Sequence, residues 1–298
     1  MVTILAIQLP VSRSIGINYG RIADNLPSPK DVAQKYKSCG IQLLRLFEPS
    51  PDVLEALKGS NLQVSLGTRN EDIQASASSP EAASQWVNTN VAPYKNDVNF
   101  KYIVLGNEVI PGPAGPSIAP ALKNMHNAIN SIGLTSTKVT TSIMMPAVEA
   151  PLMVNAYPYY AYSGDSTHNS LEYVTFQATN PVVTDGDLKY FNLFDAMVDS
   201  VYSALEKVGG AKVPIVIGET GWPTAGNEPY SSKQNAQTFN QNLLKYAQAA
   251  KGTPKRPGQP FDIFLFAMFN EDLKQSGIER NWGIFNTDTS PIYPLLQC

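Results

Sequence analysis

Short apolar, β-prone runs alternate with stretches of helical spacing along almost the whole chain. Eight runs have the length and composition of a buried strand, and they lie at 15–19, 41–46, 61–66, 100–105, 138–143, 152–156, 213–218 and 262–269. Strands that alternate with helices form parallel sheets, because a parallel pair needs a long crossover connection. Eight such units predict an α/β fold, a closed (β/α)8 TIM barrel with its helices outside.

Helix start and stop signals separate these runs. Ser28 followed by Pro29 is a typical helix N-terminus, and Gly40 is placed to end that helix. The clearest helix runs from Asn192 to Val208, where apolar residues recur at helical spacing until Gly209. The pattern therefore predicts helices between the strands, as the barrel requires.

One connection breaks this rhythm. Only about eight residues, from Met144 to Pro151, separate the fifth run from the sixth. A parallel crossover with its helix usually takes at least ten to twelve residues. Either one of these two strands is misassigned or a helix is missing.

The first fourteen residues differ from the rest. An apolar stretch from Val2 to Val11 ends in Ser12-Arg13-Ser14, a small-x-small pattern like a signal-peptidase site. We interpret 1–14 as the remnant of a secretory signal; the alternative is an ordinary N-terminal arm. No charge run or Gly/Ser linker divides residues 15–298, which we expect to form one barrel domain.

Composition narrows the class of partner. Apolar residues make up 43% of the chain and charged residues 16%, with a net charge of −3 and no cluster of Lys and Arg. A nucleic acid or an anionic membrane is therefore not expected as a partner, and no apolar run approaches the roughly twenty residues of a membrane-spanning helix. Aromatic residues, 9% of the chain, suit a neutral partner such as a sugar, although most rings belong to cores.

The two cysteines, Cys39 and Cys298, make neither a disulfide framework nor a metal-ligand spacing. One disulfide between them is possible in principle, but we expect both cysteines to be free. No metal or other cofactor is expected.

Polar residues follow several of the predicted strands, where a barrel carries its active site. Glu108 and Glu219 stand out, because each comes at the end of a strongly apolar strand, the fourth and the seventh. Hydrolysis of a glycosidic bond needs two carboxyl groups, one protonated and one ionised. Strands four and seven lie on opposite sides of the barrel mouth, so this pair can flank a sugar. The alternative is a structural role, in which they neutralise Arg45 or Lys274.

Five stretches carry a resemblance to a known family. They are IGINYGRIADNLP at 15–27, YIVLGNEVIPG at 102–112, VNAYPYYAYSGD at 154–165, IVIGETGWPTAG at 215–226, and FAMFNEDLK through WGIF at 266–285. With them the chain resembles the plant glucan endo-1,3-β-glucosidases of glycoside hydrolase family 17. The resemblance implies a retaining endo-hydrolase of 1,3-β-D-glucosidic linkages in β-1,3-glucans of the callose or laminarin type.

The resemblance also implies roles for individual residues. Glu108 would be the general acid/base and Glu219 the nucleophile, with their carboxyl groups about 5–5.5 Å apart. Asn107 would hydrogen-bond the sugar hydroxyl next to the reacting carbon. Aromatic side chains beside the motifs would bind substrate: Tyr19, Tyr157, Trp222 and Phe285. A supporting polar set would comprise Arg45, Glu271, Lys274 and Glu279.

The short connection departs from the family pattern. Family members resembling this chain have roughly thirty more residues between the fifth and sixth strands, so the fifth crossover loop and helix look deleted. We expect apolar surface of strands five and six to face water, the barrel to be opened or strained there, and one wall of the cleft to be lower. A second departure is Phe47, where family members usually have Tyr.

The family implies a protein of the apoplast, cell wall or vacuole that acts in plant defence or in cell-wall glucan turnover, and we expect a monomer. Two other functions stay open. One is hydrolysis of 1,3;1,4-β-glucan, since the same motifs resemble both activities. The other is non-catalytic glucan binding, if the shortened crossover has impaired the site.

Overall fold

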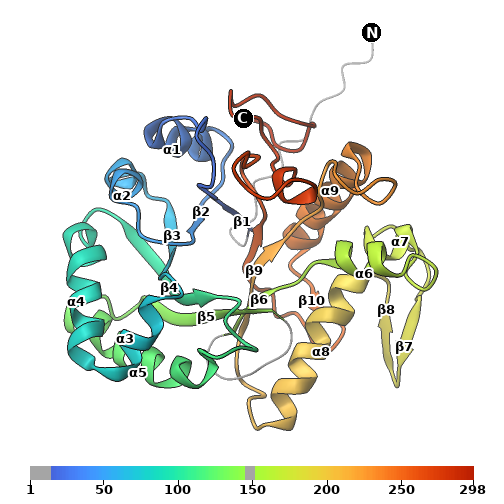
Figure 1. Ribbon diagram of the computed structural model, residues 1–298. Coiled ribbons are helices and arrows are strands. Elements are labelled where there is room, and N and C mark those ends of the chain that lie inside the picture. The colour runs from blue at the N-terminus through green and yellow to red at the C-terminus, as the bar shows by residue number, and fades with distance from the viewer. Residues whose placement is uncertain (1–14, 145–151) are drawn as a thin grey trace.

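The computed structural model describes residues 15–144 and 152–298, and at its centre lies a closed barrel of parallel strands (Figure 1). In chain order the strands are β1 (Ile15–Asn18), β2 (Leu43–Leu46), β3 (Gln63–Gly67), β4 (Asn99–Asn107), β5 (Lys138–Met144), β6 (Leu152–Asn155), β9 (Ile215–Thr220) and β12 (Ile263–Leu265). Each pairs with the next, and β1 closes the ring by pairing with β12. The eight predicted strands and the (β/α)8 barrel are confirmed.

Helices surround the barrel (Figure 1). They are α1 (Pro29–Ser38), α2 (Pro51–Leu57), α3 (Asp72–Ser78), α4 (Pro80–Asn90), α5 (Gly115–Ser131), α8 (Leu193–Lys207) and α9 (Lys233–Ala249). The predicted signals operate at their ends, since the Ser28 side chain caps α1 by accepting from the Asp31 backbone N–H at 3.2 Å. The helix predicted over 192–208 is α8, and Asn192 caps it.

Smaller elements complete the chain. The connection from β6 to α8 contains two short helices, α6 (Pro158–Gly164) and α7 (Leu171–Val174), and a hairpin of β7 (Val183–Asp185) and β8 (Leu188–Tyr190). A second hairpin, β10 (Gly252–Thr253) and β11 (Arg256–Pro257), follows α9. The 3-10 turns are η1 (Ala92–Tyr94) and η2 (Ile278–Arg280).

The barrel is closed where we expected it to open. β5 and β6 pair in register from Thr141 with Leu152 to Met144 with Asn155, so neither strand is misassigned. Leu152 lies opposite Thr141, three residues before Met144, so Met144 and Leu152 are roughly 11 Å apart. The eight peptide links between them can span about 26 Å or more. A short connection therefore suffices for the return, and the expectation of an opened barrel is wrong. The connection itself, residues 145–151, lies outside the described residues, as does the expected signal remnant 1–14.

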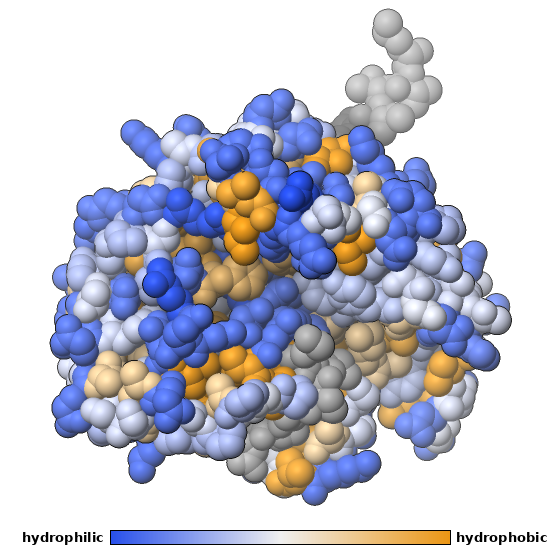
Figure 2. Space-filling view, viewed as in Figure 1, coloured by the Kyte–Doolittle hydropathy of each residue, from blue (hydrophilic) through white to orange (hydrophobic). Residues whose placement is uncertain are grey.

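The expectation of exposed apolar surface on these strands is also wrong. Ile143, Leu152 and Val154 are buried in the main core between the barrel and its helices. On the face drawn in Figure 2, apolar residues form small separate patches among hydrophilic ones, which is usual for a protein surface. Packing around β5 and β6 thus keeps these three side chains from water.

A second apolar cluster fills the barrel interior. It consists of Leu43, Tyr102, Val104, Met153, Val216 and Phe264. Gly16 leaves room for it, because a Cβ there would lie 2.6 Å from both Leu43 and Phe264. A filled interior fixes the strands, and therefore the side chains at their carboxyl ends.

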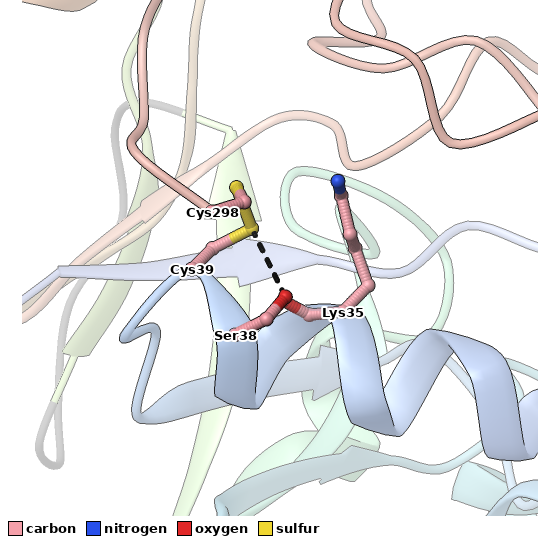
Figure 3. Close-up of a disulfide and its surroundings, with 4 residues drawn as sticks. All are labelled: Lys35, Ser38, Cys39 and Cys298. Carbon is pink, nitrogen blue, oxygen red and sulfur yellow. Dashed lines mark hydrogen bonds between the residues drawn. A yellow bond between two sulfur atoms is a disulfide. The ribbon is translucent and has the colours of Figure 1, made fainter.

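Cys39 and Cys298 are joined by a disulfide, which corrects the expectation that both are free (Figure 3). Cys39 is the C-terminal cap of α1, beside Ser38, and Cys298 is the last residue. The bond links positions 259 residues apart in sequence. Such a separation leaves no local pattern, because only closure of the barrel brings the end of the chain beside the first helix.

Within the described ranges, the structure contains no helix with both the length and the apolar character that crossing a membrane requires.

Candidate active site

A cleft with a volume of about 1250 Å³ lies at the carboxyl ends of the barrel strands. Its walls come from the loops after β1, β2, β3, β4, β6 and β12, and from the end of β9. Both Glu108 and Glu219 line it. The prediction that these glutamates meet at the barrel mouth is therefore confirmed.

An irregular end of β4 carries Glu108. The pairing of β4 with β5 shifts register between Val104 and Asn107, and two residues there have left-handed backbone, Gly106 at φ +65° and Glu108 at φ +56°. A Cβ on Gly106 would lie 2.6 Å from Ile73 Cδ1, and the left-handed backbone there also favours glycine. The Glu108 backbone N–H donates to the carbonyl of Ser142 at 2.9 Å, which fixes the turn. The sequence Gly-Asn-Glu thus ends the strand and turns the glutamate into the cleft.

Glu219 is held by three donors. Its Oε1 accepts from Arg45 Nη1 at 3.1 Å and from Asn155 Nδ2 at 2.8 Å, and its Oε2 accepts from the Tyr157 hydroxyl at 2.8 Å. The residue is only 7% exposed. Hydrogen bonds from three donors, one of them a cation, hold this carboxyl group in a fixed orientation.

Asn155 connects the two glutamates. Its Nδ2 donates to Glu108 Oε1 at 2.9 Å as well as to Glu219 Oε1 at 2.8 Å. Because both bonds share one nitrogen, the two oxygens lie no farther apart than the sum of these lengths, about 5.7 Å. That limit accommodates the carboxyl separation of about 5–5.5 Å typical of retaining glycosidases, and it is shorter than the 6.5 Å or more of inverting enzymes.

The surroundings of Glu108 raise its pKa. Burial raises the pKa of Glu108; the hydrogen bond from Asn155 opposes this effect, and the negative charges of Glu219 and Glu279 reinforce it. Burial also raises the pKa of Tyr157 well above its usual value, so its hydroxyl remains a donor to Glu219. A carboxyl that retains its proton beside a carboxylate held by cationic and neutral donors is the arrangement that acid-assisted nucleophilic attack requires.

The other predicted polar residues surround this pair. Tyr19, Asn107, Tyr157, Glu271, Lys274 and Glu279 line the cleft. Arg45 lies beneath them, almost fully buried, and its Nη2 donates to Asn107 Oδ1 at 2.8 Å. Lys274 forms an ion pair with Glu271 at 2.9 Å, and Glu271 also accepts from the Ile22 backbone N–H. Their placement at the cleft is as predicted.

Two predicted sugar-binding rings are elsewhere. Trp222 is 0% exposed, packs against Phe239 and Tyr159, and donates through Nε1 to the Tyr230 carbonyl. Phe285 is 3% exposed, and the Lys35 ammonium lies 4.5 Å from its ring centroid. Neither lines the cleft. The prediction that they contact sugar is wrong, because neighbourhood to a motif does not reveal which way a side chain points.

The sequence analysis missed several cleft residues. Asn155 ends the apolar run of β6, and that position was the available signal. Trp282 and Tyr160 also line the cleft, where the Trp282 ring lies 5.1 Å from that of Tyr157 and 6.0 Å from that of Tyr160. Nothing in the local sequence distinguishes these rings from core aromatics. In the part of the chain that the structure describes, no three His, Cys, Asp or Glu side chains gather as metal ligands.

Comparison with known proteins gives consistent results. The model of glycosyl hydrolases family 17 matches residues 15–149 and 144–297. The chain is 40% identical to a probable glucan endo-1,3-beta-glucosidase, BG4, of Arabidopsis thaliana, over 95% of this chain and 91% of that protein. It is 41% identical to the basic vacuolar isoform GLB of glucan endo-1,3-beta-glucosidase from Nicotiana tabacum, over 97% and 86% of the two chains.

A solved structure agrees with the fold. CJP38, a beta-1,3-glucanase and pollen allergen of Cryptomeria japonica, superposes with a TM-score of 0.88 at 39% identity, over 95% of this chain and 98% of the other. The comparison with the Arabidopsis protein extends over 315 positions, whereas 95% of this chain is about 283 residues, so roughly thirty positions have no counterpart here. The two segments of the family match overlap at residues 144–149, within the shortened connection.

Proposed function

The chain belongs to glycosyl hydrolases family 17 and is an endo-1,3-β-glucan hydrolase, and we propose that Glu108 and Glu219 carry out its reaction by double displacement. The observation that carries this proposal is the shared donor Asn155, which keeps Oε1 of Glu108 within about 5.7 Å of Oε1 of Glu219, a limit compatible with a retaining pair. The pKa of Glu108 is raised, and Glu219 forms an ion pair with the buried Arg45.

In the first step Glu219 attacks the anomeric carbon while Glu108 gives its proton to the departing glycosidic oxygen. Oε2 of Glu219 accepts one hydrogen bond and Oε1 accepts two, so Oε2 has the freer lone pair for attack. The bond to the leaving sugar breaks as the glycosyl-enzyme bond forms. In the second step water attacks the same carbon, Glu108 takes its proton, and Glu219 is released. Two inversions give net retention.

Asn107 is oriented for substrate. Its Oδ1 is occupied by Arg45 Nη2 at 2.8 Å, which leaves its amide N–H₂ to donate. A hydroxyl beside the reacting carbon is the acceptor that the proposal assigns to it, and this bond strengthens in the transition state.

The size of the cleft suits a polymer. Its volume of about 1250 Å³ exceeds the roughly 300–1000 Å³ of small-molecule pockets. Aromatic rings at the cleft, Tyr157, Tyr160 and Trp282, offer apolar faces to sugars. A cleft of this size favours attack within a glucan chain. The proposed reaction involves the polysaccharide and a single copy of the protein, without a nucleic acid or a membrane.

The proposal includes a compartment. A disulfide persists in oxidising surroundings, and Cys39 and Cys298 form one. A secreted protein of the apoplast or cell wall, or a vacuolar one, meets that condition, in a role in plant defence or glucan turnover. Interpretation of 1–14 as a signal remnant predicts that purified secreted protein begins at Ile15, which N-terminal sequencing tests.

The decisive experiment is release of reducing sugar from laminarin by the wild type, Glu108→Ala and Glu219→Ala. We expect an active wild type and at least a 1000-fold loss in both variants. The matched control is Glu172→Ala, an exposed glutamate on α7, which should keep the wild-type rate. An active wild type with either variant retaining most of its rate overturns the assignment. Parallel assays on mixed 1,3;1,4-β-glucan and a binding assay distinguish the other two functions.

A further inference from the structure

We propose that Asn155 is a positioning residue, whose single amide group sets the separation of Glu108 and Glu219 and stabilises whichever of them is negatively charged. This inference rests on the proposed roles of the two glutamates. It concerns a residue at the end of β6 that touches both carboxyl groups.

The amide of Asn155 is matched to its neighbours. Its Nδ2 lies 2.9 Å from Glu108 Oε1, 2.8 Å from Glu219 Oε1 and 3.4 Å from Asn107 Oδ1. An amide nitrogen has two hydrogens, and the two short contacts account for both. The residue is 5% exposed, so water hardly competes for these bonds.

The backbone places this side chain between the glutamates. Asn155 is the register partner of Glu219 in the pairing of β6 with β9, and of Met144 in the pairing with β5. Adjacent strands therefore bring Asn155 and Glu219 side by side on the cleft face. Glu108 approaches from the far side of β5, held through its backbone N–H by the Ser142 carbonyl.

Ser142 also holds the amide by a hydrogen bond to its oxygen. Its hydroxyl donates to Asn155 Oδ1 at 3.0 Å in a fully buried position. If the amide were turned over, Oδ1 would face two carboxyl groups and the hydroxyl would face the N–H₂. An ionised carboxylate only accepts hydrogen bonds, so the carboxyl side favours the observed orientation, and the Ser142 hydroxyl donates to Oδ1 in that orientation. Ser142 thus holds Glu108 through its carbonyl and Asn155 through its hydroxyl.

The shared donor can stabilise negative charge on each glutamate in turn during the proposed reaction. Glu219 is negative before attack, and Glu108 is negative once it has given up its proton. Negative charge therefore passes from one carboxyl to the other and returns in the second step. A fixed neutral donor bonded to both serves each state without reorganising, which is how preorganised dipoles lower a barrier. A lysine in its place would hold both groups ionised and oppose proton donation.

The test compares Asn155→Ala and Ser142→Ala with the wild type on laminarin. For Asn155→Ala we expect kcat to fall about 100-fold. The basic limb of the kcat/KM profile should move up by about one pH unit, because a donor to ionised Glu108 is lost. Ser142→Ala leaves Asn155 in place but frees its amide, so the same two changes should appear in smaller measure, with kcat lower by about 10-fold.

The control is Asn240→Ala. Asn240 is buried on α9 and donates to the Tyr293 hydroxyl, away from the cleft. Its loss should lower Tm and leave kcat within twofold and the pH profile unchanged. A structural role for Asn155 would produce this same outcome, and Asn155→Ala with unaltered kcat and basic limb overturns the proposal.

If Asn155→Ala does not fold, Ser142→Ala decides by the same criteria: a raised basic limb supports the proposal, and an unaltered one overturns it. Failure of the proposed function is a separate result, because it shows in the wild type and in Glu108→Ala and Glu219→Ala.

Discussion

Arg45 Nη1 and Glu219 Oε1 form an ion pair of 3.1 Å in which the two side chains are 1% and 9% exposed. Arg45 comes from β2 and Glu219 from β9, so the pair spans the barrel mouth. Nη1 also donates to the Gly218 carbonyl at 2.8 Å, and Nη2 to Asn107. One guanidinium therefore aligns the proposed nucleophile and the proposed sugar-binding amide, and its rigid fork is what permits this.

Replacement of Arg45 should affect both activity and stability. Arg45→Met leaves Glu219 buried without its cation, which should lower the free energy of unfolding by about 3–5 kcal/mol and kcat by at least 100-fold. Arg45→Lys keeps the charge but lacks the fork, so it should recover stability better than activity. Urea denaturation and laminarin assays measure these effects. Lys58→Ala, which breaks an exposed pair with Glu55, is the control and should leave the urea midpoint unchanged. A Lys variant with wild-type kcat contradicts the expectation.

The pH profile should reflect Glu108. In the proposed mechanism its proton goes to the leaving group, so we expect kcat/KM to fall as pH rises through the pKa of Glu108, which burial raises above the ordinary glutamate value of 4.5. Glu279 contributes to this rise through its negative charge. Glu279→Gln should therefore lower that pKa and move the basic limb to lower pH by less than about one unit. Glu172→Gln should not move it. An upward shift in Glu279→Gln contradicts this interpretation.

The sequence was sufficient to predict the barrel and the meeting of Glu108 and Glu219 at its mouth. Runs such as 100–105 and 213–218 are apolar throughout because parallel strands are buried on both faces. Residues after such runs share one mouth in a closed barrel, and Glu108 and Glu219 were therefore predicted to meet. Both inferences need only the order of residues along the chain.

Contacts between distant segments could not be predicted in the same way. The partners of Asn155 come from β4, β5 and β9, and the direction of Trp222 is decided by packing against α9. The pairing of Cys39 with Cys298 depends on how the barrel closes. The opened barrel expected from the shortened connection was wrong, because the effect of that connection depends on how β5 and β6 are staggered, which composition does not reveal.

The burial of Trp222 predicts that its replacement affects stability and not substrate binding. Trp222→Ala removes a ring packed against Phe239 and Tyr159, and it should lower the free energy of unfolding by about 3–5 kcal/mol. The KM for laminarin should stay within twofold in protein that remains folded at 15 °C. Trp282→Ala provides the contrast, because that ring lines the cleft and its loss should raise KM severalfold. The reverse pattern contradicts the placement of the two rings.

The disulfide should stabilise the fold without affecting catalysis. It closes a loop of 259 residues, so its reduction increases the entropy of the unfolded chain and should cost up to about 5 kcal/mol. Neither cysteine lines the cleft, and initial rates at 25 °C should stay within twofold. Differential scanning fluorimetry with and without dithiothreitol measures the change in Tm. The Cys39→Ser/Cys298→Ser variant should already show the lower Tm and no response to the reductant. A wild-type Tm unaffected by complete reduction contradicts this.

A buried acid beside α9 should make stability depend on pH. Asp195 Oδ1 accepts from the Tyr246 hydroxyl at 2.7 Å and Oδ2 from Asn192 Nδ2 at 2.8 Å. Burial raises the pKa of Asp195 from 3.8 to about 6. Between these values the folded state holds a proton that the unfolded state releases, so folding is favoured at the low end of the window and loses up to about 3 kcal/mol as pH rises through 6.

Asp195→Asn removes this titration at nearly constant shape. Relative to the wild type, the variant should gain stability progressively from pH 4 to pH 7, as measured by urea unfolding at each pH. The difference between the two proteins isolates Asp195 from Asp199, whose pKa burial also raises. Tyr246→Phe removes a donor to the ionised form, so its stability should fall more steeply with pH than that of the wild type. A difference between wild type and Asp195→Asn that is constant from pH 4 to pH 7 would show that Asp195 binds its proton equally in the folded and unfolded states, which contradicts the raised pKa.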